Sequence, residues 1–257
     1  MPDRIYAHVP YHRLAENLET IISARINPEI FFPADTLDSL IPEEAAAIMN
    51  NLRSAGLCST IHAPFMDLNP GSFEPLLRQA TIHRFEQVLA AAEIVQPEMI
   101  VMHPGYDRWR YGDRQPDWLE LALPVFRMVD AKAAAIGCRI AIENIFDEEP
   151  SVLKALIEAI DSPRVGHCFD VGHWNLFHSV SMAEWFAELG ERIIHVHVHD
   201  NHGQRDDHFP IGDGNIDFDE YFRLMDRYAP NASYAIEAHD RNKVLLAQER
   251  LLKRLKG

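Results

Sequence analysis

The 257-residue sequence has few cysteines and no long apolar run. Its three cysteines, Cys58, Cys138 and Cys168, are odd in number and far apart, so they indicate neither a disulfide framework nor a thiolate zinc site. No stretch approaches the roughly 20 apolar residues that a membrane-crossing helix needs. The N-terminal residues also lack the basic segment and apolar run of a secretion signal. We therefore expect a cytoplasmic protein without membrane attachment.

Basic residues are also scarce, with 24 Lys and Arg against 39 Asp and Glu and a formal net charge of −15. Because broad binding to nucleic-acid phosphates depends on Lys and Arg displacing counterions, this balance disfavours a nucleic-acid-binding protein and leaves only a local basic groove open. Histidine, in contrast, is abundant, with 14 residues and no consecutive run that would indicate a purification tag. The first question is therefore whether these histidines bind metal.

Short β-type segments alternate with longer stretches of helical periodicity, a pattern that predicts parallel strands joined by crossover helices. We expect eight strands, at 4–9, 28–32, 59–63, 99–103, 139–144, 165–170, 192–199 and 233–238. Their spacing averages about 32 residues, which suits one βα unit each. No linker interrupts the pattern, so residues 1–257 are expected to form a single domain. Eight such units fit either an open doubly wound sheet or a closed (β/α)8 TIM barrel.

Local signals mark several helix ends. Gly56, Gly137 and Gly190 stand where a helical pattern stops before a strand, the usual place for a residue in the left-handed conformation. Pro42, followed by two glutamates, predicts the start of another helix, because proline is tolerated in the first turn and carboxylates complement the positive end of the helix dipole.

Polar residues at the ends of six consecutive strands distinguish the barrel from the open sheet. In order along the chain they are His62, His103, Glu143, Asp170, His197 and Glu237. An open sheet concentrates its site at one switch point, whereas the carboxyl ends of all barrel strands surround one centre. The distribution therefore favours a (β/α)8 TIM barrel with these side chains around a shared site.

Three further candidates lie in loops. His173 follows Asp170 by three residues, and Asp206 and His208 are two apart, so an extended backbone points both to one side. Imidazole and carboxylate ligands without thiolate suit Zn, Mn, Co or Fe better than Ca or Mg. Nine ligands exceed what one ion needs, so we expect two to three divalent ions per chain, with open positions for water or substrate.

Each candidate also has an ordinary structural interpretation. For Glu143 and Glu237 that interpretation is weak, because an ionised carboxylate in a strongly apolar strand needs a cation or a dedicated partner. His62 and His103 fit either ligands or groups that hold a substrate oxygen. On spacing alone, the loop pair at 206 and 208 also fits ordinary solvated residues.

Seven other histidines are expected to be structural. His195 and His199 share the face of His197 and are interpreted as packed groups or as partners of a ligand. The others in this class are His8, His12, His167, His178 and His239.

The segments IENIF, FDVGHWN, HVHVHDN and HFPIGDGNIDF, in this order, resemble the xylose isomerase-like barrel superfamily. That superfamily includes sugar epimerases and isomerases and the endonuclease IV group. Resemblance to the epimerases implies one metal held by Glu143, Asp170, His197 and Glu237. It also implies that the two glutamates form the acid–base pair that moves a proton at the carbon next to a carbonyl.

The substrate implied by this resemblance is a small sugar, a sugar phosphate or a related keto compound. His173 and Arg205 are expected to contact substrate oxygens, and Trp109 or Trp174 to wall the pocket. A metal-dependent isomerase or epimerase is the leading hypothesis, and the sequence leaves a homo-oligomer open.

Resemblance to endonuclease IV proteins implies an alternative, a phosphodiester hydrolase that acts on abasic DNA or another phosphoester. These proteins hold three zinc ions at nine positions, and the matching residues here are His62, His103, Glu143, Asp170, His173, His197, Asp206, His208 and Glu237. The segment INPEIFFPADTLDSL lacks the basic loop with which DNA-binding members enter the duplex, and this favours sugar chemistry. A binding protein with a degenerate site is the third hypothesis.

Overall fold

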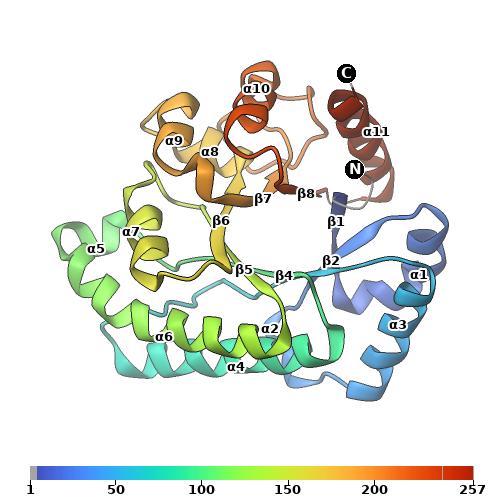
Figure 1. The fold of residues 1–257 in the computed structure, drawn as a ribbon, viewed down its shortest axis with the longest axis horizontal. Coiled ribbons are helices and arrows are strands. Elements are labelled where there is room, and N and C mark those ends of the chain that lie inside the picture. Colours follow the sequence, from blue (N-terminus) through green and yellow to red (C-terminus); the bar gives the residue numbers. More distant parts are fainter. Residues whose placement is uncertain (1–4, 239, 257) are drawn as a thin grey trace.

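The computed structural model describes residues 5–238 and 240–256, whose eight strands form one closed parallel barrel (Figure 1). The strands are β1 (Ile5–Pro10), β2 (Asn27–Phe31), β3 (Thr60–His62), β4 (Met99–Met102), β5 (Arg139–Glu143), β6 (Val165–Asp170), β7 (Ile193–Val198) and β8 (Ser233–Ile236). They pair in sequence order, and β8 closes the ring on β1. This confirms the predicted (β/α)8 barrel. Two predicted positions, the first strand's start at Arg4 and the structural His239, lie outside the described residues.

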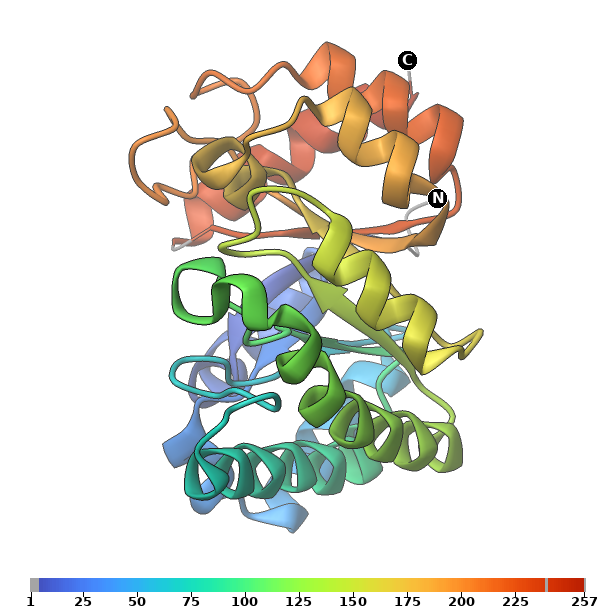
Figure 2. The same ribbon diagram turned by 90° about the vertical axis from the view of Figure 1, so that its left-hand side faces the viewer.

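Helices connect the strands and surround the barrel (Figure 2). They are α1 (Leu14–Ser23), α2 (Ala34–Asp38), α3 (Pro42–Ser54), α4 (Pro75–Val95), α5 (Arg108–Tyr111), α6 (Gln115–Ile136), α7 (Ser151–Ile160), α8 (Val171–Phe177), α9 (Met182–Leu189), α10 (Phe218–Tyr228) and α11 (Arg241–Lys256). The two long helices α4 and α6 lie side by side along one side of the barrel in both views (Figure 1 and Figure 2). Within the described residues, no helix combines the length and apolarity needed to cross a membrane.

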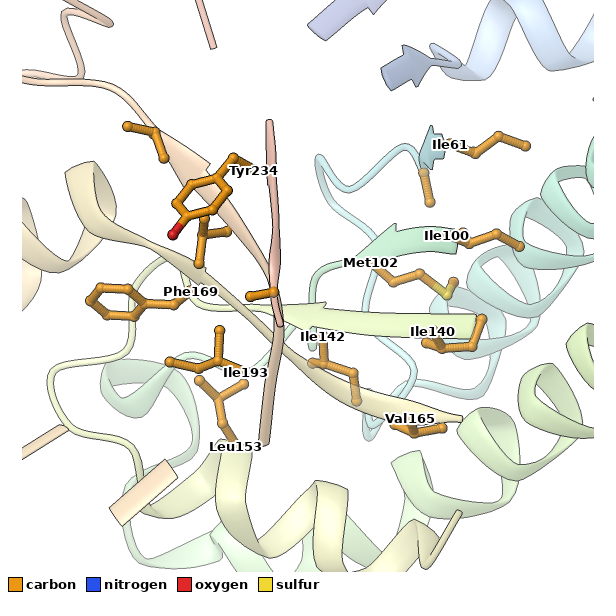
Figure 3. Packing of buried hydrophobic residues seen from close by; sticks show 14 of the residues in the cluster. Ile61, Ile100, Met102, Ile140, Ile142, Leu153, Val165, Phe169, Ile193 and Tyr234 are labelled. Carbon is orange, nitrogen blue, oxygen red and sulfur yellow. The ribbon is translucent and has the colours of Figure 1, made fainter. Parts of the chain in front are cut away.

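Alternation along the strands divides the apolar residues into two sets. One set, which includes Ile100, Ile140 and Phe169, faces outward and packs beneath the helices (Figure 3). The other set is a small cluster of Met99, Val101, Ala141 and Cys168 inside the barrel. Toward the carboxyl ends of the strands, buried polar residues follow this small cluster, among them Glu143, Asp170 and His197.

The left-handed conformation predicted for three glycines at helix ends is present in two of them. Gly56 and Gly137 have φ angles of +72° and +89°, in the left-handed region, as predicted. The prediction for Gly190 is wrong, because its φ is −59° and it begins a 3-10 turn, Gly190–Arg192. A Cβ at this position would lie 2.8 Å from the Cβ of Tyr228, so Gly190 serves close packing rather than a left-handed turn.

Candidate metal centre

The six predicted ligands at the strand ends converge at the carboxyl end of the barrel. His62, Glu143 and Asp170 are the last residues of their strands, and His197 is the last but one of β7. The other two, at positions 103 and 237, directly follow β4 and β8. All six side chains are buried. Parallel register places Asp170 beside His197 on neighbouring strands, so closure of the sheet brings side chains distant in sequence together.

The nitrogen Nδ1 of His197 is the meeting point of three carboxylates. It lies 3.1 Å from Glu143 Oε1, 3.3 Å from Glu237 Oε1 and 3.7 Å from Asp170 Oδ2. In the described residues, His197 Nδ1 and Glu143 Oε1 are buried without a hydrogen-bond partner. Ligand atoms around a tetrahedral zinc ion are about 3.3 Å apart, since each lies 2.0–2.2 Å from the metal. Their distances to His197 Nδ1 make these four residues, which we call the inner site, candidates to share a divalent cation.

The second oxygen of Glu143 faces two histidines. Its Oε2 lies 3.1 Å from His62 Nε2 and 3.2 Å from His103 Nε2. The Nδ1 of His62 contacts the carbonyl oxygen of Ala63 at 2.9 Å and must donate to it. In the neutral ring the lone pair is then on Nε2, toward Glu143. The carboxylate of Glu143 thus connects the inner site to this histidine pair.

A third group, which we call the outer site, lies nearer the mouth of the barrel. Asp206 Oδ2 is 3.2 Å from His208 Nε2 and 3.5 Å from His173 Nε2. The Asp170 side chain caps α8 by accepting the His173 N–H at 2.7 Å, and this places His173 over the cluster. His208 Nε2 is also 3.3 Å from Glu237 Oε2. All nine predicted ligands thus lie in one continuous cluster.

The loop that carries Asp206 and His208 is organised by Asp200, a buried residue that the sequence did not single out. Its carboxylate accepts backbone N–H groups of Asn201, Gly212 and Gly214 at 2.8–2.9 Å. A Cβ at Gly214 would lie 2.2 Å from Asp200 Oδ1, so only glycine permits this approach. These hydrogen bonds therefore fix the two ends of the loop.

Besides His173 in the outer site, the three other predicted substrate contacts lie in different surroundings. Trp174 is buried and stacks on His178, with ring centroids 4.1 Å apart. Trp109 is 84% exposed on α5, and the Arg205 side chain is 85% exposed on the loop after β7. Both side chains are largely exposed, and the substrate roles of all four residues stay predictions.

Beneath the inner site lies a carboxylate that the sequence analysis missed. Glu29, on β2, is fully buried, and its Oε1 lies 2.8 Å from His197 Nε2. Its Oε2 lies 3.0 Å from His195 Nε2 and accepts a hydrogen bond from Thr60 at 2.8 Å. Glutamate within the apolar segment NPEIFF is the same signal that identified Glu143 and Glu237, so it could have been found.

The imidazoles keep the buried carboxylates ionised. Burial alone would raise the pKa of Glu143, but His103 and His197 outweigh it and hold this pKa well below its usual range. The pKa of Asp170 is likewise held well below its usual range, since His173 and His199 outweigh burial. Burial lowers the pKa of His103 to about 4, which leaves that ring neutral near pH 7. The carboxylates are therefore in the form that binds metal. Neighbouring carboxylates outweigh burial and raise the pKa values of His173 and His197 well above their usual range, so these two rings must lose a proton when an ion binds.

Comparison with known proteins identifies the family of this chain. The family model described as "Xylose isomerase-like TIM barrel" matches residues 28–255. The chain belongs to this family. Membership confirms the resemblance carried by the IENIF, FDVGHWN, HVHVHDN and HFPIGDGNIDF segments.

Relatives of this xylose isomerase-like barrel include a protein of Methanocaldococcus jannaschii, MJ1311, which is 31% identical over 184 residues. The match covers 69% of this chain and 63% of MJ1311, so it spans less than two thirds of that relative. Among solved structures, a D-tagatose 3-epimerase-like protein is 26% identical with a TM-score of 0.81, covering 98% of this chain and 97% of its own. The TTHB071 protein from Thermus thermophilus, soaked with ZnCl2, is 22% identical with a TM-score of 0.79, covering 98% of both chains.

Proposed function

We propose that this protein is a metal-dependent isomerase or epimerase that acts on a small sugar, a sugar phosphate or a related keto compound. The observation that carries the proposal is the placement of Glu143 and Glu237 close to one nitrogen, His197 Nδ1, at 3.1 and 3.3 Å. Two carboxylates that share one cation and face one substrate position are what proton transfer between two faces or two carbons requires. The similarity to a D-tagatose 3-epimerase-like protein supports the same chemistry.

Glu143, Asp170, His197 and Glu237 would hold the ion, and a Zn, Mn, Co or Fe ion bound there supplies the Lewis acidity that makes the C–H bond next to a carbonyl acidic. Each glutamate keeps a second oxygen for other contacts. Glu143 Oε2 faces the histidine pair, and Glu237 Oε2 faces His208 at 3.3 Å. These oxygens are therefore the atoms that take up and return the proton.

The burial of the two glutamates limits how readily solvent water reaches them. The exposed fraction is 1% for Glu143 and 9% for Glu237, so the glutamate pair is screened from bulk solvent. Asp206 is more open, with a side chain 37% exposed at the mouth. We infer that the substrate enters from the Asp206 side and that its carbonyl end reaches the inner site.

The test is proton exchange at the carbon next to the carbonyl. The metal-loaded protein, incubated in D2O with a panel of ketoses and keto sugars, should incorporate deuterium into its substrate. Glu143→Gln and Glu237→Gln should each lower this rate by about 10²–10⁴-fold, the usual contribution of a positioned acid or base. Glu93→Gln, an exposed residue of α4, is the matched control and should not change the rate. Wild-type turnover in both site variants would contradict the mechanism.

A second candidate is a phosphodiester hydrolase with three ions. The specific observation in its favour is that the histidine pair and the outer site add donors beyond the four that a single-ion isomerase uses. Cleavage of a duplex with one abasic site, abolished by a chelator, would favour this activity. No cleavage at high protein concentration with full metal loading would exclude it. The net charge of −15 and the short helix α2 after β2 speak for the sugar substrate.

A further inference from the structure

His199 lies between the inner and outer sites, although it is not one of the nine positions matched to the family pattern. It directly follows β7, and its side chain is fully buried. Its Nε2 lies 3.1 and 3.2 Å from the two carboxylate oxygens of Asp170, with hydrogen-bond geometry. Its ring centroid is 4.3 Å from that of His208 and 5.9 Å from that of His173. The side chain therefore contacts both sites.

The hydrogen bond to Asp170 fixes the role of the other ring nitrogen. An ionised carboxylate can only accept, so Nε2 carries the proton, and in a neutral ring Nδ1 carries the lone pair. This Nδ1 is buried, has no hydrogen-bond partner among the described residues and lies 3.7 Å from Asp206 Oδ1. A lone pair that faces a carboxylate oxygen is unfavourable unless a cation lies between them. A histidine that donates its second N–H to a carboxylate is also the usual arrangement of a metal ligand.

The backbone makes room for this ring. An ideal Cβ at Gly172, the second residue of α8, would lie 2.0 Å from His199 Cε1 and 2.5 Å from His199 Nδ1. Any side chain at position 172 would displace the imidazole. The glycine in DVGH and the histidine in HVHD are thus complementary parts of one arrangement.

We propose that His199 is a tenth metal ligand, which binds through Nδ1 and completes the outer site together with His173, Asp206 and His208. His173 Nε2 and His208 Nε2 lie 3.5 and 3.2 Å from Asp206 Oδ2, and His199 Nδ1 lies 3.7 Å from Asp206 Oδ1; ligands of a tetrahedral ion are about 3.3 Å apart. His199 also has ligand atoms within 4.8 Å of His173 and Asp170, and of His208 and Glu237. Four protein ligands leave no open position, so this ion is structural and holds the loop over the cluster. The proposal goes beyond the reaction proposed above and does not depend on it.

The experiment counts zinc ions per chain and measures their affinities by competition with a chelator. The proteins compared are the wild type, Asp206→Ala, His199→Gln and the double variant. His199→Gln retains an amide donor near the Nε2 position but removes the Nδ1 lone pair. We expect Asp206→Ala to bind one ion fewer than the wild type, and His199→Gln to weaken the same ion by about 10–100-fold. The double variant should behave like Asp206→Ala, because both residues act on one ion.

Two further variants separate ligation from general damage. Gly172→Ala leaves every donor in the chain and should weaken the outer ion at least tenfold by displacing the ring. His202→Gln removes an exposed histidine of the same loop and should change nothing. Circular dichroism of each metal-free variant checks that it folds. Should His199→Gln not fold, a difference in visible absorption between Co²⁺-loaded wild type and Asp206→Ala still tests for the four-coordinate ion.

Three results would overturn the proposal. An Asp206→Ala protein that binds as many ions as the wild type would show that there is no outer ion. A His199→Gln change that weakens the ions remaining in Asp206→Ala would show that His199 acts only through Asp170. Unchanged affinity in both His199→Gln and Gly172→Ala would show that Nδ1 is not a ligand. None of these readouts uses a substrate, so failure here is distinguishable from failure of the proposed isomerase activity.

Discussion

Replacement of Asp147 by asparagine should make the protein more stable in alkaline solution. Asp147 lies in the loop after β5 and is 6% exposed. Its Oδ2 accepts the N–H of Ile145 at 3.2 Å. Burial raises the pKa of this carboxyl from 3.8 to about 7. The folded protein therefore holds a proton on Asp147 at pH values where the unfolded chain has released it.

The sign and size of the effect follow from proton linkage. Between pH 3.8 and 7 the native state binds one more proton at this residue than the unfolded state, so the free energy of unfolding decreases as pH rises. At about 1.36 kcal/mol per pH unit, the loss over this window is about 4 kcal/mol. Asparagine is neutral at every pH and can still accept the Ile145 N–H. We expect Asp147→Asn to exceed the wild type by about 4 kcal/mol at pH 8 and by about 1 kcal/mol at pH 4.5.

Urea denaturation of the metal-free proteins at these two pH values measures the difference. Asp113→Asn is the matched control, because Asp113 lines the same cavity of ≈ 250 Å³ between the loops after β4 and β5 but is exposed. Its replacement should change the free energy of unfolding by less than about 0.5 kcal/mol. Equal stabilities of Asp147→Asn and wild type at pH 8 would refute the reasoning.

Three other outcomes are expected. Glu29→Gln should weaken zinc binding at the inner site about 10–100-fold, since the carboxylate behind His197 is lost, and should lower the free energy of unfolding by about 3 kcal/mol; calorimetric titration and urea denaturation measure both. Gly137→Ala should cost about 1 kcal/mol in thermal unfolding, because φ at this residue is +89°, and an unchanged midpoint would contradict that assignment. Zinc at 100 times its dissociation constant should stabilise the metal-free protein by about 2.7 kcal/mol per site, and a thermal midpoint indifferent to zinc would argue against any metal centre.

The barrel and the convergence of its ligands could be predicted from the sequence because both follow from strand periodicity. A residue such as Asp170, between the outward-facing Phe169 and Val171, must point into the barrel. Once the strands close in sequence order, the inward-facing residues at their carboxyl ends all point to one central site. Six strands with one polar residue each at this level were sufficient evidence.

The position of a side chain along the barrel axis was harder to predict than whether it points into the barrel. His195, His197 and His199 all face inward, and alternation alone does not say which of them meets the carboxylates. The structure shows that His195 contacts Glu29 alone among the described carboxylates, that His197 contacts Glu29 and the inner site, and that His199 contacts the inner and outer sites. This ordering depends on the stagger of β7 against its neighbours, which the sequence does not encode locally.

Side chains outside the strands were not predictable in direction. Trp109 on α5 and Arg205 in a loop were chosen for their chemistry, and both are largely exposed. Asp200 was overlooked because its function is to accept backbone hydrogen bonds from residues 12 to 16 positions away, and no spacing rule describes such a contact.

Asp200 also has an evolutionary consequence. Since its hydrogen bonds fix the ends of the 201–216 loop without any ion, the tip that carries Asp206 and His208 is free to change while the backbone path is retained. A lineage could therefore exchange two side chains at the tip and alter how many cations the cavity holds without disturbing a single strand. The Asp200 hydrogen bonds at the loop ends are the part that must be conserved, and the loop tip is the part that can vary. A few mutations at the tip could therefore change the metal content of the barrel.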